Sequence, residues 1–282
     1  MILYNFCILW ERLNLNSPIK YYGGKSYMTD IIISHFPKDY SVYIEGFGGG
    51  ASVLFAKERD KLEIYNDLGK NVYSLFKVLS DKELFEQMKE KLDLTYYSSD
   101  IRKEFIEDLK RNDLSLVDRA YKYFYVNFSS FNSVGGFSTS LCVRRNMSKS
   151  VSDYLSKVDK LFEFHNRLSS VIIENRNIFD LIEKYDDENV FFYLDPPYLK
   201  CTRTSSTNYE CEMSDNDHEK FIDKLLSSKG KFLVSNYENK IYQRLLDNGW
   251  NLYKFHSKNS CSDRMECLYF NYNLDYDVDI FD

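Results

Sequence analysis

The stretch between residues 41 and 67 constrains the fold more than any other part of the chain. A short apolar run ends in a cluster of glycines, a helical pattern follows, and a second apolar run leads to an acidic residue. This order is typical of a parallel α/β sheet that binds a nucleoside cofactor, because glycines let the backbone turn tightly and approach a ligand. The expected elements are a strand at 41–45, a turn at Gly46–Gly50, a helix at about 51–59, a strand at 61–65, and Asp67.

Two carboxylates narrow the choice of cofactor. Asp67 follows the second strand, where it can accept both ribose hydroxyl hydrogens of a nucleoside, and this suits a dinucleotide and S-adenosylmethionine equally. Glu45 lies beside the first glycine, where it would repel a pyrophosphate but attract the cationic amino acid end of S-adenosylmethionine. The pattern therefore favours S-adenosylmethionine over a nicotinamide dinucleotide.

The remaining apolar runs predict further strands around a long helical segment. Residues 80–168 have a mostly helical and polar pattern, and the last two strands after them indicate an antiparallel hairpin. We therefore predict a doubly wound, Rossmann-like α/β sheet, with a catalytic domain at 1–79 and 169–282 and an inserted helical subdomain at 80–168. The later strands are expected at 171–174, 190–195, 231–235, 250–256 and 267–272.

Composition argues against several other classes of protein. The 282 residues carry a net charge of -6, so a nucleic-acid partner would need a local basic face. The six cysteines contain no Cys-x-x-Cys pair and the four histidines do not cluster with them, so we expect no metal. The chain shows no secretory leader and no stretch long enough to cross a bilayer, which predicts a cytoplasmic protein with reduced thiols and no membrane partner.

The tetrapeptide Asp195-Pro196-Pro197-Tyr198 follows an apolar strand and is the candidate catalytic segment. Consecutive prolines remove two N–H donors and leave bare carbonyls at the sheet edge where α/β folds bind ligands. An aromatic amine is a poor nucleophile because its lone pair is delocalised into the ring. The Asp195 carboxylate and the Pro196 carbonyl could hold its two hydrogens and free that lone pair. Tyr198 can stack on a purine that has left a duplex.

With these motifs in order, the chain resembles the DNA adenine methylase family, the α-arranged adenine-N6 methyltransferases. Its segment 19–25 is similar to the family's amino-terminal motif, whose aromatic residue and lysine contact the cofactor. The resemblance implies an enzyme that moves a methyl group from S-adenosylmethionine to the exocyclic amino group of adenine in duplex DNA, after base flipping. It assigns the cofactor to Tyr21, Gly24, Lys25, Glu45, Gly46, Phe47, Gly48, Gly50, Ala51, Ser52, Asp67, Asn177, Ile178 and Asp195.

One position departs from the family's pattern. The family commonly places an Asp after the third strand, where it contacts the adenine amino group of the cofactor, and here that residue is Asn177. An Asn carbonyl can accept the same hydrogen bond without the charge. We expect a weaker affinity for the cofactor, and an affinity unchanged by Asn177→Asp would contradict this.

The segment 119–152 contains no acidic residue and is the candidate DNA-binding region. Its arginines and lysines therefore make a local patch of positive charge in an acidic protein, and phosphates attract positive charge. Aromatic residues before Phe128 have helical spacing and are expected in the core, whereas the loop at 129–138 could read bases or fill the gap left by a flipped adenine. The expected DNA contacts are Arg119, Lys122, Ser130, Asn132, Arg144, Arg145 and Lys149.

Three alternatives stay open at the level of sequence. A nicotinamide-dependent dehydrogenase would use the glycine turn and Asp67 but leave Lys25 and the Asp-Pro-Pro-Tyr segment idle. A methyltransferase for RNA or for another amino group could use a related catalytic motif. A non-catalytic DNA-binding module would not need both the cofactor turn and Asp195. A monomer is the simplest expectation, since one enzyme acts on each target strand.

Overall fold

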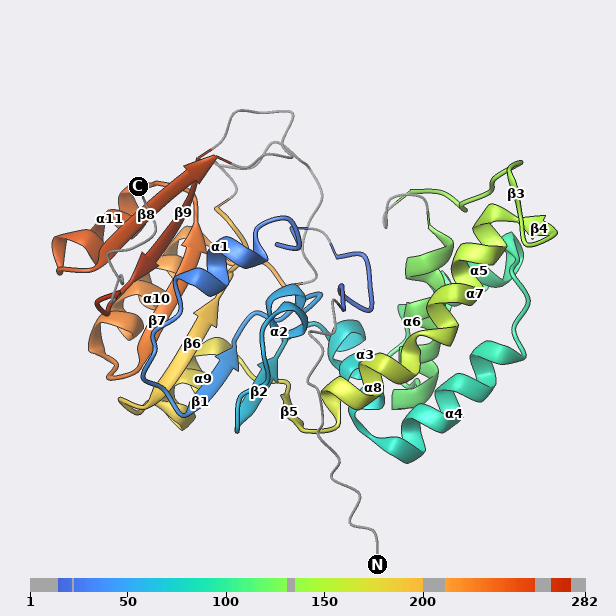
Figure 1. Ribbon diagram of the computed structural model, residues 1–282, viewed down its shortest axis with the longest axis horizontal. Helices are drawn as coiled ribbons and strands as arrows, with labels where there is room; N and C mark the ends of the chain where they lie inside the picture. The colour runs from blue at the N-terminus through green and yellow to red at the C-terminus, as the bar shows by residue number, and fades with distance from the viewer. Residues whose placement is uncertain (1–14, 22, 131–134, 200–210, 257–264, 275–282) are drawn as a thin grey trace, which may run out of the picture.

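A seven-stranded sheet forms the centre of the protein in the computed structural model, which describes residues 15–21, 23–130, 135–199, 211–256 and 265–274. The strand order is β5-β2-β1-β6-β7-β9-β8, and the first five strands are parallel, while β9 runs antiparallel between β7 and β8 (Figure 1). The strands are β1 (Val42–Glu45), β2 (Glu63–Asn66), β5 (Val171–Glu174), β6 (Val190–Leu194), β7 (Lys231–Asn236), β8 (Asn251–His256) and β9 (Met265–Phe270).

The direction of winding reverses between β1 and β6, which pair with Ile44 opposite Phe192. From β1 the chain continues outward through β2 to β5, and from β6 it continues outward on the other side to β7. In open α/β sheets ligands bind beside the carboxyl ends of the strands at such a reversal. The topology therefore places the ends of β1 and β6, at Glu45 and Leu194, at the expected site.

Alternate residues of the central strands enter two separate cores, as the period of a strand requires. Tyr43 and Phe191 face one side, and their neighbours Ile44 and Phe192 face the other. Strands that are buried on both faces are apolar throughout, which explains the uninterrupted sequence of β6. The Ile44 face is covered by α9 (Ile178–Tyr185), α10 (Asp215–Ser227) and α11 (Lys240–Asp247), and the Tyr43 face by α1 (Thr29–Ser34) and α2 (Ser52–Ala56).

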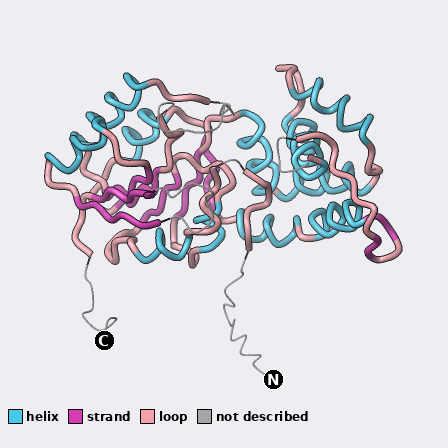
Figure 2. Tube along the Cα trace, turned by 90° about the horizontal axis from the view of Figure 1, so that it is seen from above, coloured by secondary structure: helices cyan, strands magenta, loops and turns pink. Residues whose placement is uncertain are grey.

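The other helices gather at the β5 end of the sheet (Figures 1 and 2). Tyr125 and Tyr154 belong to the same buried cluster as Tyr43 and Phe191, so the helical segment shares its core with the sheet. These elements are α3 (Lys70–Ser80), α4 (Lys82–Asp93), α5 (Ser99–Leu109), α6 (Leu116–Ser129), a hairpin of β3 (Val143–Arg144) and β4 (Met147–Ser148), α7 (Lys149–Asp159) and α8 (Leu161–Leu168).

The mostly parallel α/β sheet and its closing antiparallel pair are confirmed, and so is the burial of the aromatic residues Tyr121, Phe124 and Tyr125 of α6. The division into a catalytic domain and an inserted subdomain at 80–168 stays a prediction. The helix after the glycine turn ends at Ala56 instead of near residue 59, because Lys57 has an extended backbone. Among the described helices, none is long and apolar enough to cross a membrane.

Candidate active site

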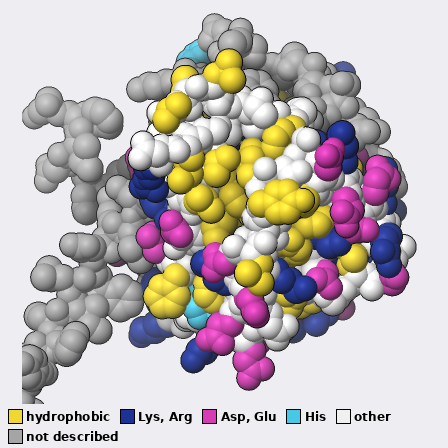
Figure 3. All heavy atoms as spheres, turned by 90° about the vertical axis from the view of Figure 1, so that its right-hand side faces the viewer, with side chains coloured by type: hydrophobic (Ala, Val, Ile, Leu, Met, Phe, Trp, Pro, Cys, Tyr) yellow, Lys and Arg dark blue, Asp and Glu magenta, His cyan; other side chains and the backbone are white. Residues whose placement is uncertain are grey.

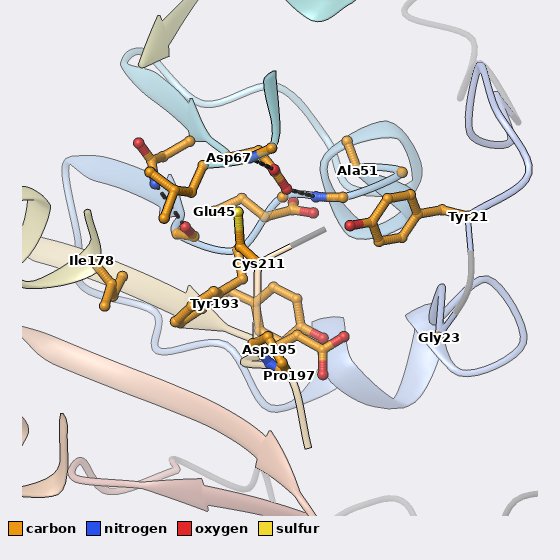
Figure 4. Close-up of a pocket in the computed structure, with 18 of the residues that line it drawn as sticks. Tyr21, Gly23, Glu45, Ala51, Asp67, Ile178, Tyr193, Asp195, Pro197 and Cys211 are labelled. Carbon is orange, nitrogen blue, oxygen red and sulfur yellow. Dashed lines mark hydrogen bonds between the residues drawn. The ribbon is translucent and has the colours of Figure 1, made fainter. Parts of the chain in front are cut away.

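A cavity of about 240 Å³ lies at the carboxyl ends of β1, β2 and β6 (Figure 4). All fourteen residues that the sequence assigned to the cofactor line it, together with Pro197 of the catalytic segment. Pro196 and Tyr198 are buried next to it and do not line it. The fold thus brings together residues that are spread over more than 170 positions of the sequence, although contact with a cofactor stays a prediction.

The glycine turn is shaped by the protein's own aromatic side chains. A Cβ atom at Gly48 would lie 2.0 Å from the ring of Tyr65, and one at Gly49 would lie 2.6 Å from the ring of Tyr21. Gly49 also has a φ of 48°, a conformation that favours glycine. The turn therefore requires glycines even before a ligand is considered.

Asp67 holds this turn in place. Its Oδ2 accepts a hydrogen bond of 2.7 Å from the Gly49 N–H, and its Oδ1 accepts one of 2.7 Å from the Gly69 N–H. Each carboxylate oxygen has two lone pairs, so it can accept more than one hydrogen bond. Asp67 thus has a structural role beside the ligand role that the sequence suggested.

Glu45 is buried at the end of β1 and faces the cavity (Figure 4). Its Oε2 accepts hydrogen bonds from the Tyr43 hydroxyl at 2.9 Å and the Leu54 N–H at 2.8 Å. Burial raises the pKa of Glu45 to about 8, and these two bonds and Lys57 only partly oppose it. A carboxyl group in this state gains most from a ligand that brings a positive charge to it.

Asp195 follows β6 and is held by two donors at the same oxygen. Lys25 Nζ lies 2.9 Å from Asp195 Oδ1, and the Ser235 hydroxyl donates to the same atom at 2.6 Å. Lys25 comes from the amino-terminal segment and Ser235 from the neighbouring strand β7. The first contact links two residues that the sequence singled out, whereas Ser235 was predicted only as part of a strand.

Tyr198 is almost fully buried beside this group. Its hydroxyl donates to Glu266 at 2.9 Å, Lys25 Nζ lies 4.6 Å from the centre of its ring, and Tyr237 packs edge-on against it at 4.7 Å. Glu266 belongs to β9 and also accepts from Tyr27 at 3.5 Å. Glu266 was not among the predicted site residues, because only the pairing of distant strands brings it here. Stacking of Tyr198 on a purine stays a prediction.

Asn177 lines the cavity and caps α9. Its Oδ1 accepts a hydrogen bond of 3.0 Å from the Phe179 N–H. The preceding residues are tied to β2, since Asn66 accepts from the Arg176 N–H at 2.8 Å. The cap holds the Asn177 side chain in place beside the cavity. Leu68, Phe179, Cys211 and Met213 also line the cavity, and no motif in the sequence marked them.

Two of the predicted DNA contacts do not present accessible side chains. Arg119 is 7% exposed, and its guanidinium donates to Asn71 and to the carbonyls of Leu109 and Arg111. It ties α6 to the connection before it, so we drop it from the DNA-binding set. Ser130 is 1% exposed, and its hydroxyl bonds to Arg102 and to the Val126 carbonyl, which gives it a structural role as well.

The remaining candidates lie on or near the helical end of the molecule. Lys122 is half-buried and pairs with Asp108, and Asn132 lies outside the described residues. Arg144, Arg145 and Lys149 are exposed at the hairpin of β3 and β4 and the start of α7. The face at this end mixes hydrophobic and charged side chains (Figure 3).

The hairpin closes with an unusual turn. Arg145 and Asn146 both have positive φ values, 53° and 58°, which is the backbone of the two-residue turn that matches the twist of paired strands. Leu141 and Val143 lead into the turn and are 102% and 76% exposed. The hairpin therefore presents cationic and apolar side chains together.

The fold and the site define an α/β protein with a cavity at the reversal of its sheet and an Asp-Pro-Pro-Tyr segment beside it. The chain belongs to the family of D12 class N6 adenine-specific DNA methyltransferases, whose family model matches residues 21–262. The protein is therefore an adenine-specific DNA methyltransferase, and methyltransferases of this family use S-adenosylmethionine as methyl donor.

Relatives of similar length agree with this assignment. The chain is 27% identical to the type II methyltransferase M.MjaIII of Methanocaldococcus jannaschii, over 85% of this chain and 90% of that protein. It is 26% identical to the type II methyltransferase M1.LlaDCHI of Lactococcus lactis subsp. cremoris, over 79% and 81%. It is 24% identical to the type II methyltransferase M.CviBI of Paramecium bursaria Chlorella virus NC1A, over 77% and 80%.

Proposed function

We propose that this chain binds S-adenosylmethionine in the cavity at the reversal of the sheet and methylates the N6 amino group of an adenine that has left duplex DNA. The observation that carries the proposal is the position of Asp195, which borders the same cavity as Glu45 and Asp67. A methyl donor held by those two carboxylates and an amine held by Asp195 would then meet at one sheet edge.

The donor set of the cavity fits S-adenosylmethionine. Glu45 is a buried carboxyl group with a raised pKa, and a cationic amino acid group beside it would stabilise its charged form. Asp67 lines the cavity as a hydrogen-bond acceptor for ribose hydroxyls, and Asn177 lines it as an acceptor for the adenine amino group of the cofactor. The same carboxylates would repel the pyrophosphate of a nicotinamide dinucleotide. Both the family and the cavity therefore argue against the dehydrogenase alternative.

The catalytic segment acts by holding the amine. In the proposed site, the Asp195 carboxylate and the Pro196 carbonyl accept the two amino hydrogens of the adenine, which localises the nitrogen lone pair. S-adenosylmethionine held by Glu45 and Asp67 would supply an electrophilic methyl group, and its sulfur would keep the C–S electron pair. The methylated nitrogen then loses one proton, for which the Asp195 carboxylate is a base within the site.

The helical end of the molecule is the proposed DNA-binding region. Arg144, Arg145 and Lys149 supply positive charge to phosphates, and the loop at 129–138 lies between α6 and this hairpin along the chain. The proposed reaction requires base flipping, because an adenine amino group that stays within a duplex cannot reach a cavity at the sheet edge. We propose that a monomer carries out the reaction, since one enzyme acts on each target strand.

Transfer of labelled methyl from S-adenosylmethionine to unmethylated duplex DNA tests the proposal, with the product nucleosides identified by mass. We expect N6-methyl-2′-deoxyadenosine from the wild type and a loss of at least about 100-fold for Asp195→Ala. Asp247→Ala is the matched control, because Asp247 is exposed at the end of α11. Full activity of Asp195→Ala would refute the catalytic role of Asp195. A preference for RNA over duplex DNA would show that the substrate is RNA.

A further inference from the structure

The carboxylate of Asp195 is anchored on one side only. Among the residues that the structure describes, both groups bonded to this carboxylate, Lys25 Nζ at 2.9 Å and Ser235 Oγ at 2.6 Å, meet it at Oδ1. One carboxylate oxygen offers two lone-pair directions, and two donors occupy them. The other oxygen, Oδ2, is left to accept hydrogen bonds from an incoming group.

The position of Ser235 follows from the register of the sheet. Leu194 of β6 pairs with Val234 of β7 in parallel, so the next residues, Asp195 and Ser235, are also neighbours at the carboxyl edge. Ser235 is fully buried, and its hydroxyl also lies 3.5 Å from that of Tyr193. A donor on a central strand is held by the ladder on both sides and is more rigid than one on a loop.

We propose that Ser235 is a positioning residue for methyl transfer, which fixes Asp195 so that Oδ2 is the oxygen that accepts the hydrogen bond from the target amine. The proposal rests on the role of Asp195 under the proposed function. A carboxylate turns about its Cβ–Cγ bond, and a turn moves the acceptor away from the amine. A short bond to a charged group, such as the 2.6 Å bond from Ser235, opposes that rotation.

Ser235 and Lys25 have different parts in this arrangement. Lys25 carries charge, contacts the Tyr198 ring and belongs to the segment that borders the cofactor cavity, so its loss would disturb several contacts at once. Ser235 is neutral and does not border the cavity. Loss of the Ser235 hydroxyl would therefore change the orientation of the Asp195 carboxylate with little effect on the binding of either substrate.

Steady-state kinetics of Ser235→Ala and Ser235→Thr test the proposal. We expect Ser235→Ala to lower kcat on the order of 10- to 100-fold, since a misaimed acceptor costs that much, and to leave both KM values within about three-fold. Ser235→Thr keeps the hydroxyl and should recover most of kcat. Ser74→Ala is the matched control, because Ser74 is buried and donates to a carbonyl within α3, away from the cavity.

Unfolding curves and the affinity for S-adenosylmethionine separate positioning from a general loss of structure. If Ser235→Ala lowers kcat only in proportion to a loss of folded protein or of cofactor affinity, the positioning role is wrong. A kcat within two-fold of the wild type, while Asp195→Ala is inactive, would also overturn it and leave the proposed function standing. Activity retained in Asp195→Ala would overturn both.

Discussion

Glu45 shows how one side chain joins the fold to the cavity at the sheet edge. It ends β1, bonds to Tyr43 on the same strand and to the start of α2 through the Leu54 N–H, and so fixes the turn between them. A buried carboxyl group is costly in its charged form, which is why its pKa is raised to about 8. The group has a structural partner on one side and the cavity on the other.

This pKa predicts a pH dependence of stability. The folded pKa lies above the ordinary value of 4.5, so between these two values the folded protein holds a proton that the unfolded chain has lost. Its contribution to stability is full below pH 4.5 and decreases as pH rises toward 8, by up to about 1.4 kcal/mol per pH unit. Glu45→Gln should remove this part of the slope, and urea unfolding at pH 6 and pH 7.5 measures it. Equal slopes in the two proteins would contradict the assignment.

At the same scale, the sequence predicted which residues surround the cavity better than it predicted their partners. Glu45 ends β1, and Asp67 and Asp195 directly follow β2 and β6. Parallel strands bring such ends to one edge, so local patterns were sufficient. Ser235 and Glu266 contact Asp195 and Tyr198 only through the register of β7 and β9 with the rest of the sheet. Register between distant strands is a property of the fold, and no local motif encodes it.

The hairpin of β3 and β4 is the element that the sequence pattern did not reveal. Its turn residues, Arg145 and Asn146, have left-handed backbones without a glycine, and its strands have two residues each, so neither turn composition nor alternation was visible. The burial of Arg119 escaped the sequence analysis for a related reason. The sequence showed its charge, but burial depends on how α6 packs against the connection before it.

The charges of the hairpin are not equivalent, which refines the prediction for DNA binding. Arg144 and Lys149 both pair with Asp153, whereas Arg145 bonds only to the neutral Ser156 hydroxyl among the described residues. Arg144→Ala with Arg145→Ala should weaken DNA binding and lower the slope of log K against log salt by one to two units, at about 0.9 per phosphate contact. Arg145→Ala alone should account for more than half of this change.

Fluorescence titrations of duplex DNA at several salt concentrations measure both slopes. Lys38→Ala with Lys61→Ala is the matched control. Both residues are exposed just before β1 and β2, at the amino ends of the strands, and their removal gives the same change in net charge. A salt slope that falls equally in the control, or that stays unaltered in the hairpin variant, would exclude the hairpin as the phosphate-contacting element.

At the scale of the whole molecule, a buried ion cluster joins the helical end to the sheet on the side away from the cavity. Glu63, at the start of β2, accepts from Arg167 of α8 at 2.5 and 2.8 Å and pairs with Lys57 after α2. Burial alone would raise the pKa of Glu63, but Arg167 and Lys57 outweigh it and lower the pKa. Arg167 also donates to the Leu54 carbonyl at 2.8 Å, so one guanidinium connects α8, α2 and β2.

Removal of this guanidinium should destabilise the entire protein. Arg167→Ala leaves a buried carboxylate with one partner fewer, which costs about 3–5 kcal/mol, and because the helices and the sheet share one core, unfolding should remain a single transition. Arg244→Ala is the matched control, since its pair with Asp223 at 2.5 Å is exposed and should contribute less than about 1 kcal/mol. Urea unfolding followed by fluorescence and by circular dichroism measures both. Two separate transitions would show that the helical end and the sheet fold independently. Equal losses of unfolding free energy in the two variants would refute the role of burial.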